Sequence, residues 1–123
     1  EHYEALVAAL GRFDLVHLGL GADGHTASLF PGSPALDADP DRLVVLTRDP
    51  TGRNPHERMT LTFAGIARAR LAIVTVSGEE KREAFARVVA DDPTCPATRI
   101  RAGHVVWLVD PPAAGDLLRS PAR

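Results

Sequence analysis

A glycine-rich stretch carries the residues best suited to chemistry. Residues 19–24 are Gly-Leu-Gly-Ala-Asp-Gly, and His25 follows directly. Histidine is the side chain best suited to general acid–base catalysis near neutral pH. Glycines such as Gly21 and Gly24 let the backbone turn sharply and approach a substrate, which would present Asp23 and His25 to it. An Asp-Gly turn followed by an exposed histidine without a chemical role is the alternative.

The same six residues match the dinucleotide-binding fingerprint G-x-G-x-x-G. A true fingerprint opens a long crossover helix, whereas Pro31 stops any helix here within about two turns. The acidic residues near position 40 lie in a turn, not at the end of a second strand. The sequence therefore argues against a dinucleotide-binding loop.

Lys81 is a candidate for binding an anionic substrate. It follows Ser77, Gly78 and two glutamates, where a strand is predicted to pass into a helix. Helix N-termini present free N–H groups and partial positive charge, so anions bind there. The alternative is a plain helix start, with Ser77 as the N-cap and the glutamates favouring the first turn.

Arg58 is the second candidate cation, at the head of an alternating Arg-Met-Thr-Leu-Thr segment. An arginine there could bind a phosphate or a carboxylate bidentately, or it could be a surface residue before a helix. Thr60 and Thr62 are predicted to cap that helix. Arg53 and His56 lie in a polar loop that could close over a substrate, although a mobile loop without chemistry is the simpler interpretation.

Other polar residues have no predicted chemical role. His17 lies inside a predicted buried strand and is interpreted as a core histidine. Ser28 is not part of a G-x-S-x-G motif, which argues against a serine nucleophile. Cys95 is the only cysteine, which excludes an intrachain disulfide and a multi-cysteine zinc site. No metal site is expected.

Strands and helices alternate along the chain, and the strands are apolar throughout, which is typical of a parallel sheet buried on both faces. The expected fold class is α/β: an open, mostly parallel sheet with helices on both faces, a Rossmann-like three-layer arrangement. Four strands are few for this fold. The predicted helices are 2–11, 26–30, 62–69, 79–90 and 111–118, and the predicted strands are 13–18, 43–47, 71–76 and 105–109.

Length and composition are those of an ordinary globular chain. The 123 residues are 45% hydrophobic and 24% charged, with a net charge of -2. This balance argues against disorder and gives no basic excess for nucleic acid. The longest apolar runs, such as 71–76, are too short for a membrane span of about 20 residues. No signal peptide opens the chain, so a cytoplasmic location is the default.

Residues 13–32 resemble the signature of the 6-phosphogluconolactonase family. Members carry LGxGxDGHTASLFPG after a buried strand, and this segment is FDLVHLGLGADGHTASLFPG. The related glucosamine-6-phosphate isomerases/deaminases share Asp-Gly-His but typically continue with Phe-Asn-Glu-Pro, where residues 28–31 are Ser-Leu-Phe-Pro. The lactonase branch is therefore favoured. Later blocks also resemble the family in order, namely 58–62, 78–81, 95–97, 106–110 and 113–114.

The resemblance implies hydrolysis of 6-phospho-D-glucono-1,5-lactone to 6-phosphogluconate in the oxidative pentose phosphate pathway, with no cofactor. It implies His25 as the base and Lys81 as a phosphate contact. Backbone N–H groups among residues 21–25 could face the oxyanion. Asp23 could orient His25, contact substrate hydroxyls or hold the loop by an Asx turn. An isomerase/deaminase of an amino sugar phosphate and a non-catalytic sugar-phosphate-binding domain are the alternative functions.

Family members are about twice this length. The phosphate loop and the Asp-Glu-Arg segment of their first half do not appear here. Residues 1–123 therefore resemble the C-terminal portion of a single α/β domain, and the N-terminal half is the expected partner. Half a sheet would leave an open strand edge and uncovered apolar surface, so this chain alone is expected to associate or to need the other half.

Overall fold

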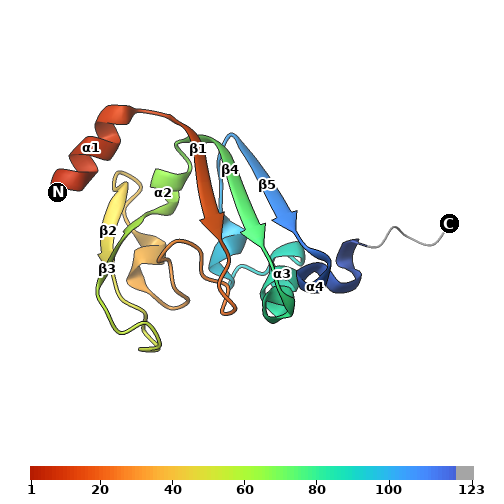
Figure 1. Ribbon diagram of the computed structural model, residues 1–123. Helices are drawn as coiled ribbons and strands as arrows, with labels where there is room; N and C mark the ends of the chain where they lie inside the picture. Colours follow the sequence, from red (N-terminus) through yellow and green to blue (C-terminus); the bar gives the residue numbers. More distant parts are fainter. Residues whose placement is uncertain (119–123) are drawn as a thin grey trace.

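A three-stranded parallel sheet organises the structure, a computed structural model that describes residues 1–118 (Figure 1). The strands lie in the order β1-β4-β5. Leu18 lies opposite Val74, and Val74 lies opposite Trp107, so the carboxyl ends of the three strands meet at one edge. The bounds are Phe13–Gly19 for β1, Ala69–Val76 for β4 and His104–Val109 for β5.

Strands β2 (Val44–Thr47) and β3 (Arg58–Leu61) form a separate antiparallel pair. The sequence predicts β2 as a strand of the parallel sheet, and that placement is wrong. Residues 48–57 join β2 to β3, and a chain that turns back directly on itself pairs antiparallel. No predicted strand corresponds to β3, because its four residues are too few to be separated from the helix expected next.

The helices mostly lie where the periodicity predicts them, but several are shorter. Predicted helix 62–69 shrinks to four residues, because Ala69 already pairs with Phe13 in the parallel sheet. Predicted helices 79–90 and 111–118 each combine a short 3-10 turn with an α-helix. The α-helices are α1 (His2–Leu10), α2 (Phe63–Ile66), α3 (Arg82–Val89) and α4 (Pro111–Ala114), and the 3-10 helices are η1 (Pro34–Asp37), η2 (Glu79–Lys81), η3 (Pro96–Arg99) and η4 (Gly115–Leu118). Within residues 1–118, none of the helices has the length and apolar character that a membrane span requires.

The predicted helix 26–30 is wrong. The Thr26 hydroxyl donates to the Gly19 carbonyl at 2.9 Å, and the Leu29 N–H donates to the Thr26 carbonyl at 2.9 Å. Ala27 has a φ of 50°, which an α-helix does not allow. Leu29 and Phe30 are fully buried. The segment is a tight turn fixed by its own polar contacts and by the burial of two large side chains.

One face of the parallel sheet carries the main hydrophobic core. Leu18, Val74 and Val76 point to this face and are buried there. Phe85 of α3 packs over it and contacts Trp107 of β5, with 6.0 Å between the ring centroids. Burying a side chain of this size stabilises the fold by about 1.5–3 kcal/mol. This packing fixes α3, and with it the turn that precedes α3, relative to the strands.

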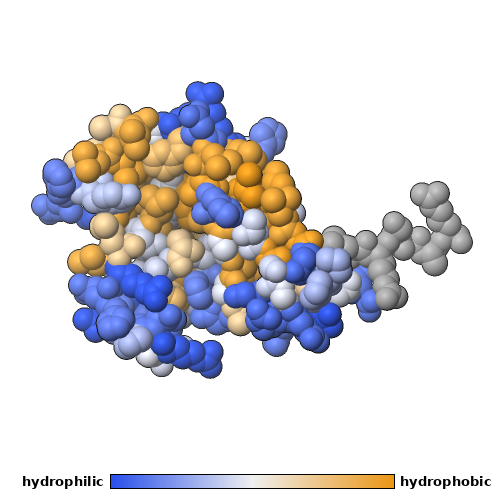
Figure 2. Space-filling view, viewed as in Figure 1, coloured by the Kyte–Doolittle hydropathy of each residue, from blue (hydrophilic) through white to orange (hydrophobic). Residues whose placement is uncertain are grey.

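The opposite face of the sheet is uncovered in the described part of the chain. Leu15, Val106 and Leu108 are 49%, 41% and 53% exposed. Figure 2 shows a continuous hydrophobic area over the strands on this face. His17 also lies here, exposed and hydrogen-bonded to the Thr75 hydroxyl at 3.1 Å, so its prediction as a core histidine is wrong. The predicted α/β class with a parallel sheet is confirmed, and so is the expectation of uncovered apolar surface.

Candidate active site

An open pocket of about 300 Å³ lies where β1 and β4 end. Its lining includes Gly19 at the end of β1, Gly21 and His25 from the turn that follows, and Lys81 from the turn after β4. Gly19 pairs with Thr75 of the neighbouring strand, so the two turns leave the sheet side by side. Open α/β sheets bind ligands at this carboxyl edge. The sheet thus brings together His25 and Lys81, which are far apart in sequence.

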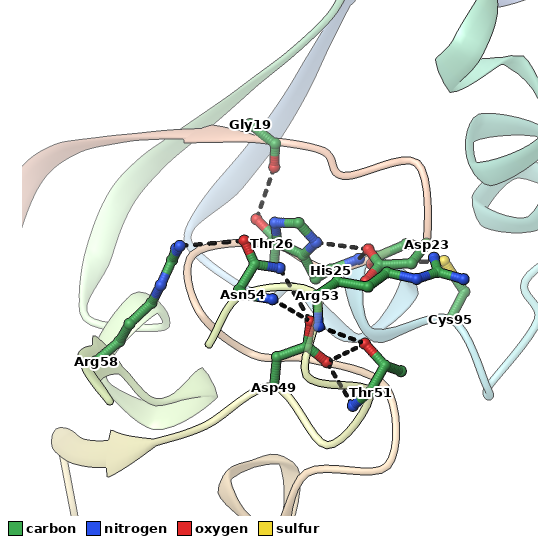
Figure 3. A network of polar contacts seen from close by, with 11 residues as sticks. Gly19, Asp23, His25, Thr26, Asp49, Thr51, Arg53, Asn54, Arg58 and Cys95 are labelled. Carbon is green, nitrogen blue, oxygen red and sulfur yellow. Dashed lines mark hydrogen bonds and ion pairs between the residues drawn. The ribbon is translucent and has the colours of Figure 1, made fainter. Parts of the chain in front are cut away.

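Asp23 holds His25 in one orientation. Oδ1 of Asp23 accepts from the His25 backbone N–H at 3.0 Å and lies 2.5 Å from Nδ1 of its ring (Figure 3). An ionised carboxylate only accepts hydrogen bonds, so Nδ1 carries the proton in this pair. Nε2 of the neutral ring is then left with its lone pair. A ring in this state can take a proton from a ligand or from water in the pocket.

Gly21 makes room for that ring. A Cβ built on Gly21 would lie 2.1 Å from Nδ1 of His25 and 2.8 Å from Oδ1 of Asp23. The Gly21 N–H donates to the His25 carbonyl at 2.8 Å, and the Gly24 N–H donates to the Gly21 carbonyl at 2.9 Å. The turn is therefore closed on itself, with the imidazole lying directly against the Gly21 backbone. No larger residue fits there without moving the His25 ring.

Lys81 reaches the pocket from a different kind of turn. Its side chain is half-buried, and among residues 1–118 no acidic side chain pairs with its ammonium group. Gly78, with a φ of 98°, lies at the start of η2, and the Ser77 hydroxyl instead donates to Asp110 at 2.5 Å. The alternative of a plain helix start capped by Ser77 is therefore wrong, because Gly78 is at the N-cap position. The Lys81 charge is left available for an anion.

The sequence of this chain is similar to those of known proteins. Residues 1–107 match the family described as glucosamine-6-phosphate isomerases/6-phosphogluconolactonase. The chain belongs to this family. The human GDH/6PGL endoplasmic bifunctional protein is 46% identical over 111 residues, which are 86% of this chain and 14% of the human protein.

Solved structures of the family agree with the fold. A 6-phosphogluconolactonase from Trypanosoma brucei is 35% identical with a TM-score of 0.80, over 94% of this chain and 51% of that one. A monomeric glucosamine-6-phosphate deaminase is 25% identical with a TM-score of 0.75, over 96% of this chain and 53% of that one. The chain thus spans about half the length of these family structures, which share its Rossmann-like α/β fold.

In this chain Arg58 is not among the residues that line the pocket of His25 and Lys81. Its guanidinium carbon is 5.7 Å from the centre of the Phe30 ring, and Nη2 donates to the Asn54 side chain at 3.1 Å. Phe30 also contacts the His25 ring, with 4.9 Å between centroids. Of the six predicted site residues, His25, Gly21 and Lys81 line the pocket, whereas Asp23 and Gly24 support it from the same turn.

The two threonines near Arg58 have different roles. Thr62 caps α2 by accepting from the Gly65 N–H at 3.0 Å, as predicted. The predicted cap by Thr60 is wrong, because its hydroxyl accepts from the Ser28 N–H at 3.1 Å. Thr60 thereby links β3 to the segment that follows His25.

Asp49 is a structural residue that the sequence reasoning missed. It is 6% exposed and accepts hydrogen bonds from the backbone and side chain of both Thr51 and Asn54 (Figure 3). The side chains of Asn54 and Thr51 lower the pKa of Asp49 to about 2. The Asp-x-Thr spacing was the available signal, because Asp accepts from the N–H two residues on. The loop that carries Arg53 and His56 is therefore internally bonded.

No metal site can be built from the described residues. Within residues 1–118, no three His, Cys, Asp or Glu side chains gather closely enough to hold an ion. Cys95 is buried as a free thiol. The candidate chemistry is accordingly that of the His25 imidazole and the Lys81 ammonium.

Proposed function

We propose that this chain forms part of a 6-phosphogluconolactonase, which hydrolyses 6-phospho-D-glucono-1,5-lactone to 6-phosphogluconate in the oxidative pentose phosphate pathway. The observation that carries the proposal is the His25 ring, whose Nδ1 lies 2.5 Å from Oδ1 of Asp23, in one pocket with Lys81. The names of the human and trypanosome relatives support it. The sequence after Asp-Gly-His, Thr-Ala-Ser-Leu-Phe-Pro, favours the lactonase branch over the deaminase branch.

In the proposed reaction His25 acts first as a base. Nε2 takes a proton from water as the water oxygen bonds to the lactone carbonyl carbon. The bond from that carbon to the ring oxygen then breaks, and the proton passes from Nε2 to this oxygen, which leaves as a hydroxyl. Such acid–base catalysis contributes about 10²–10⁴-fold to a rate. Asp23 stabilises the imidazolium that forms between the two proton transfers.

The oxyanion needs donors that are not already engaged. Within the turn, the N–H groups of Gly21, Gly24 and His25 donate inside the loop. Of the N–H groups predicted to face the oxyanion, those of Ala22 and Asp23 are therefore the remaining candidate donors. One such donor contributes about 10²–10³-fold to a rate.

Lys81 is the proposed phosphate contact. Its ammonium is a compact charge on a flexible stem, which suits attraction of a phosphate more than exact placement of a reacting atom. Arg58 stays a proposed second contact for the phosphate, because its guanidinium lies against Phe30, which also contacts the His25 ring. Within residues 1–118 only its Nη2 donates a hydrogen bond, to Asn54.

A chimera tests the function at the length of the relatives. This chain replaces the matching half of the Trypanosoma brucei 6-phosphogluconolactonase, with which it shares 35% identity. We expect the purified chimera to hydrolyse the lactone and to release no ammonia from glucosamine 6-phosphate. Ammonia release without lactone hydrolysis would place the chain in the isomerase/deaminase branch.

The isolated chain has its own expected behaviour. We propose that residues 1–123 are the C-terminal portion of one α/β domain and that the N-terminal half is their partner. Because one sheet face is apolar and uncovered, the chain alone should associate. Light scattering after size exclusion measures this, and a monomer with a cooperative melting transition would contradict it. Calorimetry with 6-phosphogluconate, beside a turnover assay, tests the alternative of a binding domain without catalysis.

The proposed location is the cytoplasm, supported by the single cysteine in this sequence. The human relative's name describes an endoplasmic protein. Fractionation of cells that express the gene-encoded protein decides between the two compartments.

A further inference from the structure

The turn that carries His25 is attached to a second segment away from the pocket. The Gly24 carbonyl accepts from the Ala97 N–H at 3.0 Å, and the Cys95 thiol points at the same oxygen from 3.8 Å. Cys95 and Ala97 are buried. Residues 92–97 therefore form the support beneath Gly24, the residue directly before His25.

Gly24 packs against residues 92–97 with no free space between them. A Cβ built on Gly24 would lie 2.7 Å from the Cys95 sulfur and 3.7 Å from Nη1 of Arg87, and the φ of Gly24 is 91°. The Gly24 backbone is packed directly against its support. A shift of the support must therefore move Gly24, and His25 with it.

Arg87 of α3 holds that support in place. Its Nε donates to Oδ2 of Asp92 at 3.0 Å, and its Nη2 donates to the Thr94 hydroxyl at 2.9 Å. Asp92 in turn accepts from the N–H and hydroxyl of Thr94 and, through its carbonyl, from the Cys95 N–H. The planar Arg87 guanidinium thus donates to both Asp92 and Thr94, a geometry that a lysine ammonium does not reproduce.

The charge states agree with this contact. Hydrogen bonds from Thr94 and Arg87 lower the pKa of Asp92 to about 2. The hydrogen bond to Asp92 raises the pKa of Arg87 above its ordinary value. The pair is therefore ionised across the neutral range, and the support does not loosen with pH there.

We propose that Arg87 is a positioning residue for His25, acting through the Asp92–Thr94 turn, Cys95 and Gly24. Arg87 does not line the pocket, and its two engaged donors face the turn. The proposal depends on the proposed function only where activity is the readout. Displacement of a reacting group by about 1 Å can cost about 100-fold in rate, so a remote residue of this kind can matter.

The kinetic test uses the active chimera with Arg87→Met and Arg87→Lys. We expect kcat to fall about tenfold in Arg87→Met and less in Arg87→Lys, with KM changed less than about twofold, because only the placement of His25 is altered. Arg82→Met on the same helix is the matched control, since Arg82 contacts Glu79 and Pro112 instead. A raised KM with unchanged kcat, or no change in either constant, would overturn the proposal.

A second test needs no activity. Histidine-selective ¹⁵N NMR of the chimera reports whether Nδ1 of His25 keeps its proton toward Asp23. We expect distinct Nδ1 and Nε2 signals in the parent and in Arg82→Met, and averaged signals in Arg87→Met. Unchanged His25 signals in Arg87→Met refute the positioning role even if the parent chimera proves inactive. If Arg87→Met does not fold, the same comparison with Arg87→Lys and Asp92→Asn gives the answer.

Discussion

The turn after β1 and the turn after β4 supply the same pocket, but they are built in opposite ways. His25 is held by Asp23, by the Gly21 backbone and by the Phe30 ring. The Lys81 side chain has no ion-pair partner in the described part of the chain. Proton transfer requires a fixed donor–acceptor geometry, whereas attraction between charges tolerates a flexible stem. Rigidity is therefore concentrated where the proposed proton transfer occurs.

The largest expected effect is the loss of the His25 ring. In the chimera, His25→Ala should lower kcat by at least about 100-fold with a smaller change in KM, because the proton acceptor is removed. Steady-state kinetics of lactone hydrolysis measures this, and circular dichroism checks that the variant folds. Turnover near that of the parent would remove His25 from the reaction.

Gly21→Ala tests whether the rigidity of the first turn is needed. The new Cβ would lie 2.1 Å from Nδ1 of His25, so the ring must move. We expect kcat to fall about 10–100-fold while the ring itself is still present. At Gly19 a Cβ would meet nothing within 4 Å, so Gly19→Ala should leave the ¹⁵N signals of His25 unchanged. Equal effects of both alanines on those signals would contradict the packing argument.

Lys81→Ala tests whether the flexible Lys81 side chain, in the turn after β4, attracts the phosphate. We expect KM to rise about tenfold with kcat changed much less, because attraction to the phosphate acts on bound substrate and transition state alike. Lys81→Arg should recover most of the loss, since the charge is retained. An unchanged KM in Lys81→Ala would leave this residue without a substrate contact.

The smallest expected effect concerns Asp110, which anchors the second turn. The Ser77 hydroxyl, then the N–H groups of Ala113 and Gly78, lower the pKa of Asp110 below its ordinary value. Its stabilising effect is therefore full above about pH 4 and is lost as the pH falls through the lowered pKa.

Asp110→Asn keeps the shape of the side chain and removes this charge. We expect a lower melting temperature than the parent near pH 7, a smaller difference below about pH 3, and a KM raised less than about threefold. Thermal melts at both pH values measure the first two, and a difference that grows on acidification would contradict the assigned sign.

The local part of the site could be predicted from the sequence because its geometry is local. Asp23, Gly24 and His25 act within a single turn, and the strand before them has a clear apolar pattern. The turn of Lys81 also follows a buried strand, but only the resemblance to the family separated a phosphate contact from a plain helix start. Residues that act through distant partners left no such pattern. Arg87 and Asp92 acquire their role only when residues 92–97 pack under Gly24.

The errors in the fold have the same physical origin. The helix expected at 26–30 fails because the Thr26 hydroxyl bonds to Gly19, a contact seven residues back. Ser77 is not a cap because Gly78 precedes η2, and the Ser77 hydroxyl donates to Asp110, 33 residues away. β2 was assigned to the wrong sheet because the short alternating segment at 58–62 was interpreted as the start of a helix and not as the partner strand β3.

Charged substitutions on the uncovered face of the parallel sheet should have opposite effects in the 123-residue chain and in a longer protein. A glutamate in place of Leu15, or a lysine in place of Val106, puts charge where water is already in contact. In the 123-residue piece this should improve solubility and yield. Where the proposed N-terminal half covers this face, the same charge would have to be desolvated, which carries a large penalty. A screen for soluble expression of this piece would therefore select the changes most harmful to that proposed assembly.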